Sequence, residues 1–257
     1  GLFERSQMVQ VLAYLRGSNQ LTYLREMTNL LFADNLRVHL RLLLIGWFGS
    51  IRDPVIEELR IARRLMGGTD DFLRFFNAVG GNEAWFDLLN NAVLPSFLQS
   101  NDEQLVDLVS NYLGTMIQHR SDAVLAHLKP FLSLSEAWDG RIAFALAHIK
   151  KWESEEALDV LYDLLQRGRT FGRESSYFYS LAESNPAAGC KALRAFLDRR
   201  LDDLLQEAQS ENPNRYFWGQ KLLGEHAAGE LIETAVQLSP FKFLEYLLPW
   251  FVRAATS

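Results

Sequence analysis

The stretch "NPAAGCKALRAFLDRR" (residues 185–200) recurs in outline near the end of the chain as "SPFKFLEYLLPWFVRAA" (residues 239–255). Each copy begins with a small polar residue and a proline, and apolar residues follow at helical spacing. Proline suits the first position of a helix, because its missing N–H costs nothing there and its fixed φ fits a helix start. Helices are therefore predicted to begin at Pro186 and Pro240. Two pairs of apolar residues are expected at matching buried places in these helices: Leu193 with Leu247, and Phe196 with Trp250.

Helical periodicity extends over almost the whole chain. Segments such as "SQMVQVLAYLR" (6–16) and "QLTYLREMTNLLF" (20–32) place apolar residues on one face. No Asn-Gly or Asp-Gly turn lies between two alternating apolar runs. The longest apolar run, residues 42–48, is far shorter than the roughly 20 residues that span a bilayer. The sequence thus predicts an all-α protein with no membrane span, and its single cysteine favours the cytoplasm.

Short connections with clear helix boundaries separate these segments. Gly168 lies where a helix should end. Helix starts are expected where a polar capping residue precedes proline or acidic residues: Asp53-Pro54, Ser121-Asp122, Ser135-Glu136, Ser154-Glu155 and Asn185-Pro186. Because the linkers are short, neighbouring helices should form antiparallel hairpins.

A second repeated feature is a proline within a predicted helix, followed closely by aromatic residues. It occurs at Pro95, Pro130 and Pro249. Helix pairs that recur at roughly 35–55 residues are typical of α-solenoids, in which each hairpin packs on the next. We therefore expect an irregular HEAT-like α-solenoid of antiparallel helix hairpins, and the alternative is a globular helical bundle. The expected domain organisation is one region, 1–257, with 1–134 and 135–257 as its sub-halves.

These units resemble the irregular helical repeats in the C-terminal regions of large bacterial STAND-type NTPases. The resemblance rests on the two proline-initiated units, on "LEYLLPWF" (244–251) and on "LRLLLIGWFGSIRDPVIEE" (40–58). Such proteins carry an N-terminal effector, a central nucleotide-binding module and a C-terminal helical sensor, and several act in antiviral defence. The resemblance implies that this chain is a fragment of a larger intracellular protein, with any NTPase or effector activity elsewhere.

The residues that support catalysis or cofactor binding form no recognisable motif. The nearest approach to a phosphate loop, "GRTFGRES" (168–175), lacks the spacing and the Lys-Ser/Thr pair of a P-loop. Cys190 is expected to be a small buried core residue. The histidines lie on different predicted helices with no H-E-x-x-H pattern: His39, His119, His127, His148 and His226. We therefore expect no catalytic residue, metal or cofactor in this segment.

Arginine and aromatic residues are the candidates for binding a partner. The net charge of −6 weighs against nucleic acid, since dedicated nucleic-acid binders usually carry a basic excess. Arginine makes bidentate contacts with acidic groups, and exposed Tyr and Trp are common interface hot spots. The candidates are Arg60, Arg63 and Arg64; Arg167, Arg169 and Arg173; and Tyr216 and Trp218 in "NRYFWGQ" (214–220). The alternatives are that the arginines are solvated helix ends and that the aromatic residues are buried core.

The leading hypothesis is a non-catalytic protein-recognition or sensor segment with an unidentified protein partner. One alternative is a HEAT-like DNA-binding or DNA-base repair protein that uses Trp85/Asp87 and Trp138/Asp139, although the acidic charge balance argues against it. Another is a passive scaffold or oligomerisation spacer, whose two faces would be equally rich in aromatic residues and arginine. The apolar stripe of the predicted helix 241–254 is wider than one helical face, so self-association through this helix is also expected.

Overall fold

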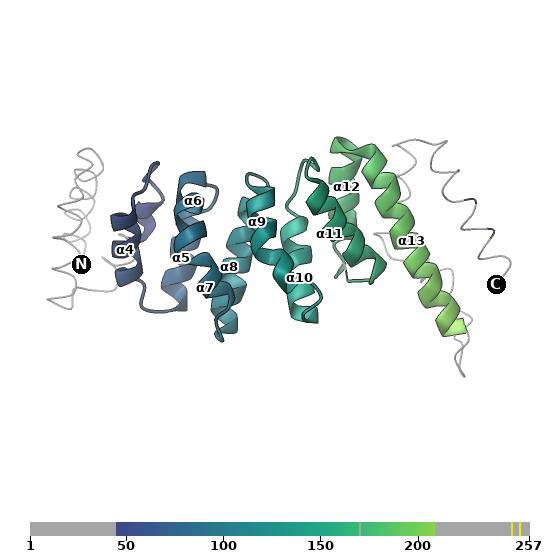
Figure 1. The fold of residues 1–257 in the computed structure, drawn as a ribbon, viewed down its shortest axis with the longest axis horizontal. Coiled ribbons are helices and arrows are strands. Elements are labelled where there is room, and N and C mark those ends of the chain that lie inside the picture. The colour runs from purple at the N-terminus through teal and green to yellow at the C-terminus, as the bar shows by residue number, and fades with distance from the viewer. Residues whose placement is uncertain (1–44, 170, 209–247, 249–251, 253–257) are drawn as a thin grey trace, which may run out of the picture. The chain divides into compact units, whose positions relative to one another are not determined.

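The computed structural model describes residues 45–169 and 171–208, together with residues 248 and 252. Every regular element in this part of the chain is helical, which confirms the all-α prediction (Figure 1). The elements are α4 (Ile56–Leu65), α5 (Thr69–Val79), α6 (Glu83–Ala92), α7 (Leu94–Leu98), α8 (Glu103–Met116), α9 (Ser121–Leu128), the 3₁₀ helix η1 (Lys129–Phe131), α10 (Glu136–Leu146), α11 (Glu155–Gln166), α12 (Glu174–Ser184) and α13 (Pro186–Ala208).

The chain divides into two compact units, residues 1–119 and residues 120–257. The boundary falls between α8 and α9, whereas the sub-halves expected from the sequence meet in the connection between η1 and α10. Consequently α9 and η1 belong to the same unit as α10.

An aromatic cluster forms part of the core of the first unit. Phe48, Phe75 and Trp85 are fully buried, and their rings meet edge to face with centroids 5.4–6.1 Å apart. Each such pair adds about 0.5–1.5 kcal/mol to the stabilisation from burial. The indole Nε1 of Trp85 also donates a 3.0 Å hydrogen bond to the backbone oxygen of Phe48. This bond ties α6 to the end of the short helical segment 45–48.

A second buried cluster holds α12 in the second unit. The rings of Trp152 and Tyr177 meet edge to face at 6.4 Å. Tyr177 donates its hydroxyl to the backbone oxygen of Ala143 at 2.7 Å, so its polar atom is satisfied inside the core. The indole of Trp152 donates to the Ser180 hydroxyl at 2.8 Å. Together these bonds join α12 to α10 and to the connection that precedes α11.

Three of the predicted helix starts are confirmed by their capping bonds. Ser135, Ser154 and Asn185 each accept a hydrogen bond from the backbone N–H three residues later, at 3.2–3.3 Å. The first N–H groups of a helix have no partner within it, and such a cap stabilises the helix by about 1 kcal/mol. α10, α11 and α13 therefore begin where the sequence placed them.

The predicted helix start at Asp53-Pro54 is wrong. α4 begins at Ile56, with the extended residue Val55 as its N-cap. The Glu58 carboxylate reaches back and accepts the backbone N–H of Val55 at 2.8 Å. A side chain inside the helix thus bonds the backbone of the N-cap residue, and Asp53 and Pro54 both lie before the helix.

Pro95 and Pro130 lie in helical elements, but the prediction of continuous helices running through them, over 82–99 and 121–134, is wrong. The chain leaves helical geometry at Val93 (φ −140°), and Pro95 lies in the first turn of the short helix α7. Pro130 lies in η1, after α9 has ended at Leu128. Proline cannot donate to the preceding turn and its ring clashes with that turn, so the chain starts a new short helix instead.

α13 begins at Pro186, as the sequence predicts. Leu193 is buried, and Phe196 is half-buried with its ring 6.0 Å from that of Phe178. Pro240, Leu247 and Trp250 lie outside the described residues, so the match between the two repeated stretches stays a prediction.

Candidate functional site

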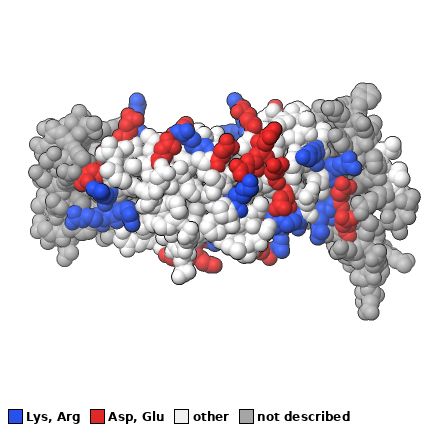
Figure 2. Space-filling model, viewed as in Figure 1, with Lys and Arg blue, Asp and Glu red and all other residues white. Residues whose placement is uncertain are grey.

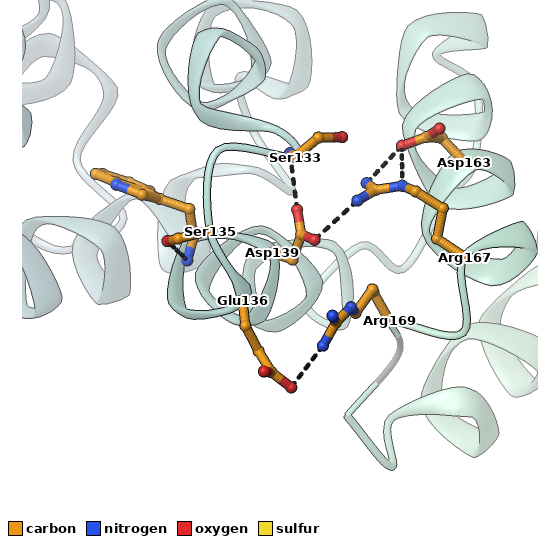
Figure 3. A network of polar contacts seen from close by, with 8 residues as sticks. Ser133, Ser135, Glu136, Asp139, Asp163, Arg167 and Arg169 are labelled. Atoms are coloured by element: carbon orange, nitrogen blue, oxygen red, sulfur yellow. Dashed lines mark hydrogen bonds and ion pairs between the residues drawn. The ribbon is translucent and has the colours of Figure 1, made fainter.

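Two loops of the second unit, one before α10 and one after α11, meet around a buried carboxylate (Figure 3). Asp139 is only 3% exposed. One of its oxygens accepts the backbone N–H of Ser133 at 2.9 Å, and the other accepts Nη1 of Arg167 at 2.8 Å. Arg167 also donates through Nε to Asp163 at 2.9 Å. A buried carboxylate is costly unless it is paired and hydrogen-bonded, so this network strongly favours one arrangement of the two loops.

The end of α11 positions the arginine of this network. Gly168 adopts a left-handed conformation (φ 67°), and its N–H donates to Leu165 O at 3.1 Å. The N–H of Arg169 donates to Leu164 O at 2.8 Å, which completes a Schellman motif. Arg167 is the C-cap residue of α11, before Gly168, and Arg169 comes directly after that glycine.

Both non-glycine residues with positive φ in the described part of the chain belong to these loops. They are Ser133 (φ 68°) and Phe171 (φ 54°). Such a conformation costs on the order of 1–3 kcal/mol and is often found at functional sites. The Asp139 carboxylate holds Ser133 through its N–H, and Phe171 lies four residues after Arg167. The Asp139–Arg167 contact therefore joins the two strained loops.

Aromatic and arginine side chains gather on α10 beside these loops. The guanidinium of Arg141 lies 4.9 Å from the ring centre of Trp138, and that of Arg173 lies 4.8 Å from the ring centre of Phe144. Phe171 is 42% exposed, and its ring lies against Gly140 of the same helix. We define the aromatic–arginine patch as Trp138, Arg141, Phe144, Phe171 and Arg173; its other four members are half-buried.

Helices α9 and α11 of the same unit present a different surface. Their exposed residues include carboxylates, which Figure 2 shows gathered on the face in view. The half-buried aromatic residue of α11 is Tyr162, whose ring lies 4.2 Å from the ammonium group of Lys191. The exposed carboxylates of this surface are Asp122, Glu155 and Asp159. α10 and the loop after α11 thus carry more aromatic and arginine side chains than α9 and α11 do, and α12 adds three further aromatic residues, Tyr177, Phe178 and the exposed Tyr179.

The first arginine cluster lies on α4. Arg60, Arg63 and Arg64 are exposed, while Leu59, Ala62 and Leu65 on the same helix are buried. Figure 2 shows basic side chains over this part of the first unit. Arg60 forms an ion pair with Glu57 at 3.5 Å, one turn earlier. The cluster is accessible, and its exposed ion pair contributes little to stability.

The second arginine cluster is held mainly by contacts within the chain. Arg167 pairs with Asp139 and Asp163, and Arg169 pairs with Glu136 from the start of α10. Arg173 lies on the Phe144 ring. Arg167 and Arg169 therefore order the loops, while Arg173 takes part in the patch.

The remaining predicted interface residues lie outside the described residues. These are Tyr216 and Trp218. Of the predicted helix 241–254, the structure describes Leu248 and Val252, and both are exposed. Self-association through this helix stays a prediction.

The described residues show no arrangement that supports metal chemistry. No group of three or more His, Cys, Asp or Glu side chains within the described ranges is placed to hold a metal ion. His127 is half-buried, and burial lowers its pKa. Cys190 is buried, which agrees with its expected place in the core. Among the described residues, no helix is both long and apolar enough to cross a bilayer.

The sequence prediction missed most of the aromatic–arginine patch. It singled out Arg173, and Trp138 only for the DNA-repair alternative, but not Arg141, Phe144 or Phe171, although "SEAWDGRIAFALAHIKKW" (135–152) carries a readable signal. In this segment Trp138 and Phe144 lie off the face that buries Ile142 and Leu146, so apolar residues occur on both faces of one helix. Apolar residues all round a helix indicate burial on both sides or a contact surface.

Comparisons with protein family models, with curated proteins and with solved structures found no match to this chain.

Proposed function

We propose that this chain is a non-catalytic, HEAT-like α-solenoid segment that recognises another protein through the aromatic–arginine patch. In this proposal it forms the sensor part of a larger bacterial STAND-type NTPase that acts in antiviral defence. Two observations support protein recognition by a solenoid: the regular spacing of contacts along the chain, and the contrast between the aromatic–arginine patch and the surface of α9 and α11.

Contacts between neighbouring hairpins support the solenoid. Side-chain hydrogen bonds between different helical elements repeatedly join residues 26–37 apart within each unit, from Tyr162–Ala188 at the short end to Trp85–Phe48 at the long end. The N-caps of α5, α8, α10 and α12 lie at residues 68, 102, 135 and 173, again about one hairpin apart. Contacts of this kind between successive hairpins are expected when each repeat packs on its neighbour. The observed separations lie near or below the lower end of the roughly 35–55 residues expected from the sequence.

The aromatic–arginine patch is the observation that carries protein recognition. Interface hot spots are enriched in Trp, Tyr and Arg and are poor in free carboxylates. A passive scaffold would distribute these residues evenly, yet the patch contrasts with α9 and α11, whose exposed residues include Asp122, Glu155 and Asp159. The patch is also built on a helix and on loops that a buried ion pair holds. Binding a partner should therefore cost little conformational entropy.

The DNA-repair alternative has less support. Trp85 is fully buried and its indole N–H is bonded to Phe48, so it is not placed to stack on a base. Trp138 lies against Phe131 with ring centres 4.0 Å apart, and the neighbouring Asp139 binds Ser133 and Arg167. The second Trp–carboxylate pair thus serves the network and the patch.

Site-specific photocrosslinking in cells tests the proposal. A benzophenone amino acid replaces Phe171 in the patch or, as a matched control, Asp159, which is exposed on α11 of the same unit. We expect one discrete crosslinked protein from position 171 and none from position 159. The purified partner should then bind the Phe171→Ala variant at least tenfold more weakly than the unchanged chain. Identical crosslinks from both positions, or unchanged affinity of the variant, would contradict recognition by the patch.

A further inference from the structure

The N-cap residue of α13 makes two different hydrogen bonds with one side chain. Oδ1 of Asn185 accepts the N–H of Ala188 at 3.2 Å and so caps its own helix. Its Nδ2 donates at 3.1 Å to the backbone oxygen of Trp152, which lies 33 residues earlier. The same side chain therefore starts one helix and reaches back to the connection before α11.

Two further N-caps have the same arrangement. Asn82 accepts the N–H of Trp85 at 3.1 Å, and its Nδ2 donates to Ile51 O at 3.0 Å, 31 residues earlier. Ser154 accepts the N–H of Ala157 at 3.3 Å and donates its hydroxyl to Asp122, 32 residues earlier, at 2.7 Å. The back-reaching bonds of Asn82, Ser154 and Asn185 thus span almost equal lengths of chain.

The chemistry of these residues separates them from the N-cap of α8. Asp102 bonds to the N–H groups of Gln104 and Leu105 in its own helix. A carboxylate only accepts, and it suits a helix N-terminus at least as well as an amide does. Asn and Ser can accept and donate at once. Capping alone would not require a donor at residues 82, 154 and 185, whereas the back-reaching bond does.

The target of Asn185 is itself firmly held. Trp152 is buried, and its backbone N–H donates to the Ser184 hydroxyl at 3.1 Å. Its indole N–H donates to the Ser180 hydroxyl at 2.8 Å. All three polar groups of Trp152 are therefore bonded to residues of α12 or to Asn185, and of these partners Asn185 is the one whose side chain also caps α13, through Oδ1.

We propose that these donor–acceptor N-caps act as latches that make successive hairpins open together. When the first turn of α13 frays, Asn185 loses its capping position and its bond to Trp152 at the same time. Opening of α13 and loosening of the preceding hairpin thereby become one event. The latch is a conformational device that transmits opening from one hairpin to the next, and it does not depend on the identity of any partner.

Hydrogen exchange followed by mass spectrometry on the full chain tests the latch. Asn185→Asp keeps the capping acceptor and replaces the donor to Trp152 by a carboxylate oxygen, which cannot bond to the backbone oxygen of Trp152. In the unchanged chain, peptides from α13 and from the connection before α11 should exchange with a common opening constant. In the variant, protection of the first turns of α13 should fall about five- to tenfold, the equivalent of one hydrogen bond, while the preceding hairpin keeps its protection.

Two further variants separate the latch from capping. Asp102→Asn changes a cap whose side chain makes no back-reaching bond to any described residue, and it should leave the exchange of neighbouring hairpins unchanged. Asn82→Asp repeats the test in the other unit, where α6 should lose protection while residues 45–51 keep theirs. An equal loss of protection on both sides of residue 185, or no loss at all, overturns the proposal.

Discussion

Arg167 and Asp139 are joined at 2.8 Å although 28 residues separate them in the chain. The contact links the end of α11 to the first turns of α10 and brings together the loops that contain Ser133 and Phe171. An exposed ion pair would contribute little, but Asp139 is almost completely buried. The arrangement of the patch therefore depends on one ion pair beneath it.

Removing the arginine of this pair should be strongly destabilising. Arg167→Met leaves the buried Asp139 carboxylate without its cation, and we expect the free energy of unfolding to fall by about 3 kcal/mol. Urea denaturation provides the measurement. Arg169→Gln, which breaks the more exposed pair with Glu136, should cost less than about 1 kcal/mol. Equal effects of the two variants would show that the Asp139 pair has no special role.

Two buried tyrosines should respond in opposite ways to loss of the hydroxyl group. Tyr177 donates to Ala143 O at 2.7 Å, so Tyr177→Phe should destabilise the protein by about 1–2 kcal/mol. The hydroxyl of Tyr112 is buried with no hydrogen-bond partner in the described part of the chain. Tyr112→Phe should therefore be neutral or stabilising by up to about 1 kcal/mol. Thermal unfolding of both variants, followed by circular dichroism, checks the difference in sign.

Stability should decrease at alkaline pH because of the same residues. Burial raises the pKa of Tyr112 and of Tyr177 above the usual value of 10.0. The unfolded chain then releases these protons at a lower pH than the folded chain does. The stabilisation of the folded state by these two protonated tyrosines is complete below about pH 10. As the pH rises further, the free energy of unfolding falls by up to about 1.4 kcal/mol per pH unit and per tyrosine. Urea unfolding from about pH 9 to about pH 11 should show this slope, and Tyr112→Phe should reduce it.

Two glycines offer a matched test of backbone conformation. Gly168 ends α11 at φ 67°, so Gly168→Ala should cost about 1 kcal/mol. Gly140 lies inside α10, where an added methyl group would meet the Phe171 ring at an ordinary 3.8 Å. Gly140→Ala should stabilise the protein by about 0.5–1 kcal/mol. If both variants were destabilised, the packing of Phe171 against α10 would have to be tighter than the structure shows.

Local signals made the helices and several of their boundaries predictable. Apolar spacing identified the helical segments, and the caps at Ser135, Ser154 and Asn185 depend on residues only three positions away. The errors at Pro54 and Pro95 arose because the same residue type can precede, open or interrupt a helix. Which of these a proline does depends on the residues around it. After Pro54, the Glu58 side chain supplies a capping bond that the sequence pattern did not reveal.

The candidate site could not be predicted in the same way. Arg167 and Asp139 stand in different helices, and no local pattern indicates that they meet. Phe171 is exposed and adopts a left-handed conformation, neither of which the residue types alone indicate. The sequence did single out Arg173, but its contact with Phe144 follows from the packing of α12 beside α10.

Cys190 is the one thiol of the whole chain, and it is buried in the first turns of α13. This helix packs on both α11 and α12. A thiol reagent can react with Cys190 only after α13 has moved away from its neighbours. The rate at which Cys190 is labelled in the unmodified protein therefore reports how often this helix moves. A partner that holds α13 against its neighbours should lower the labelling rate without contacting the sulfur.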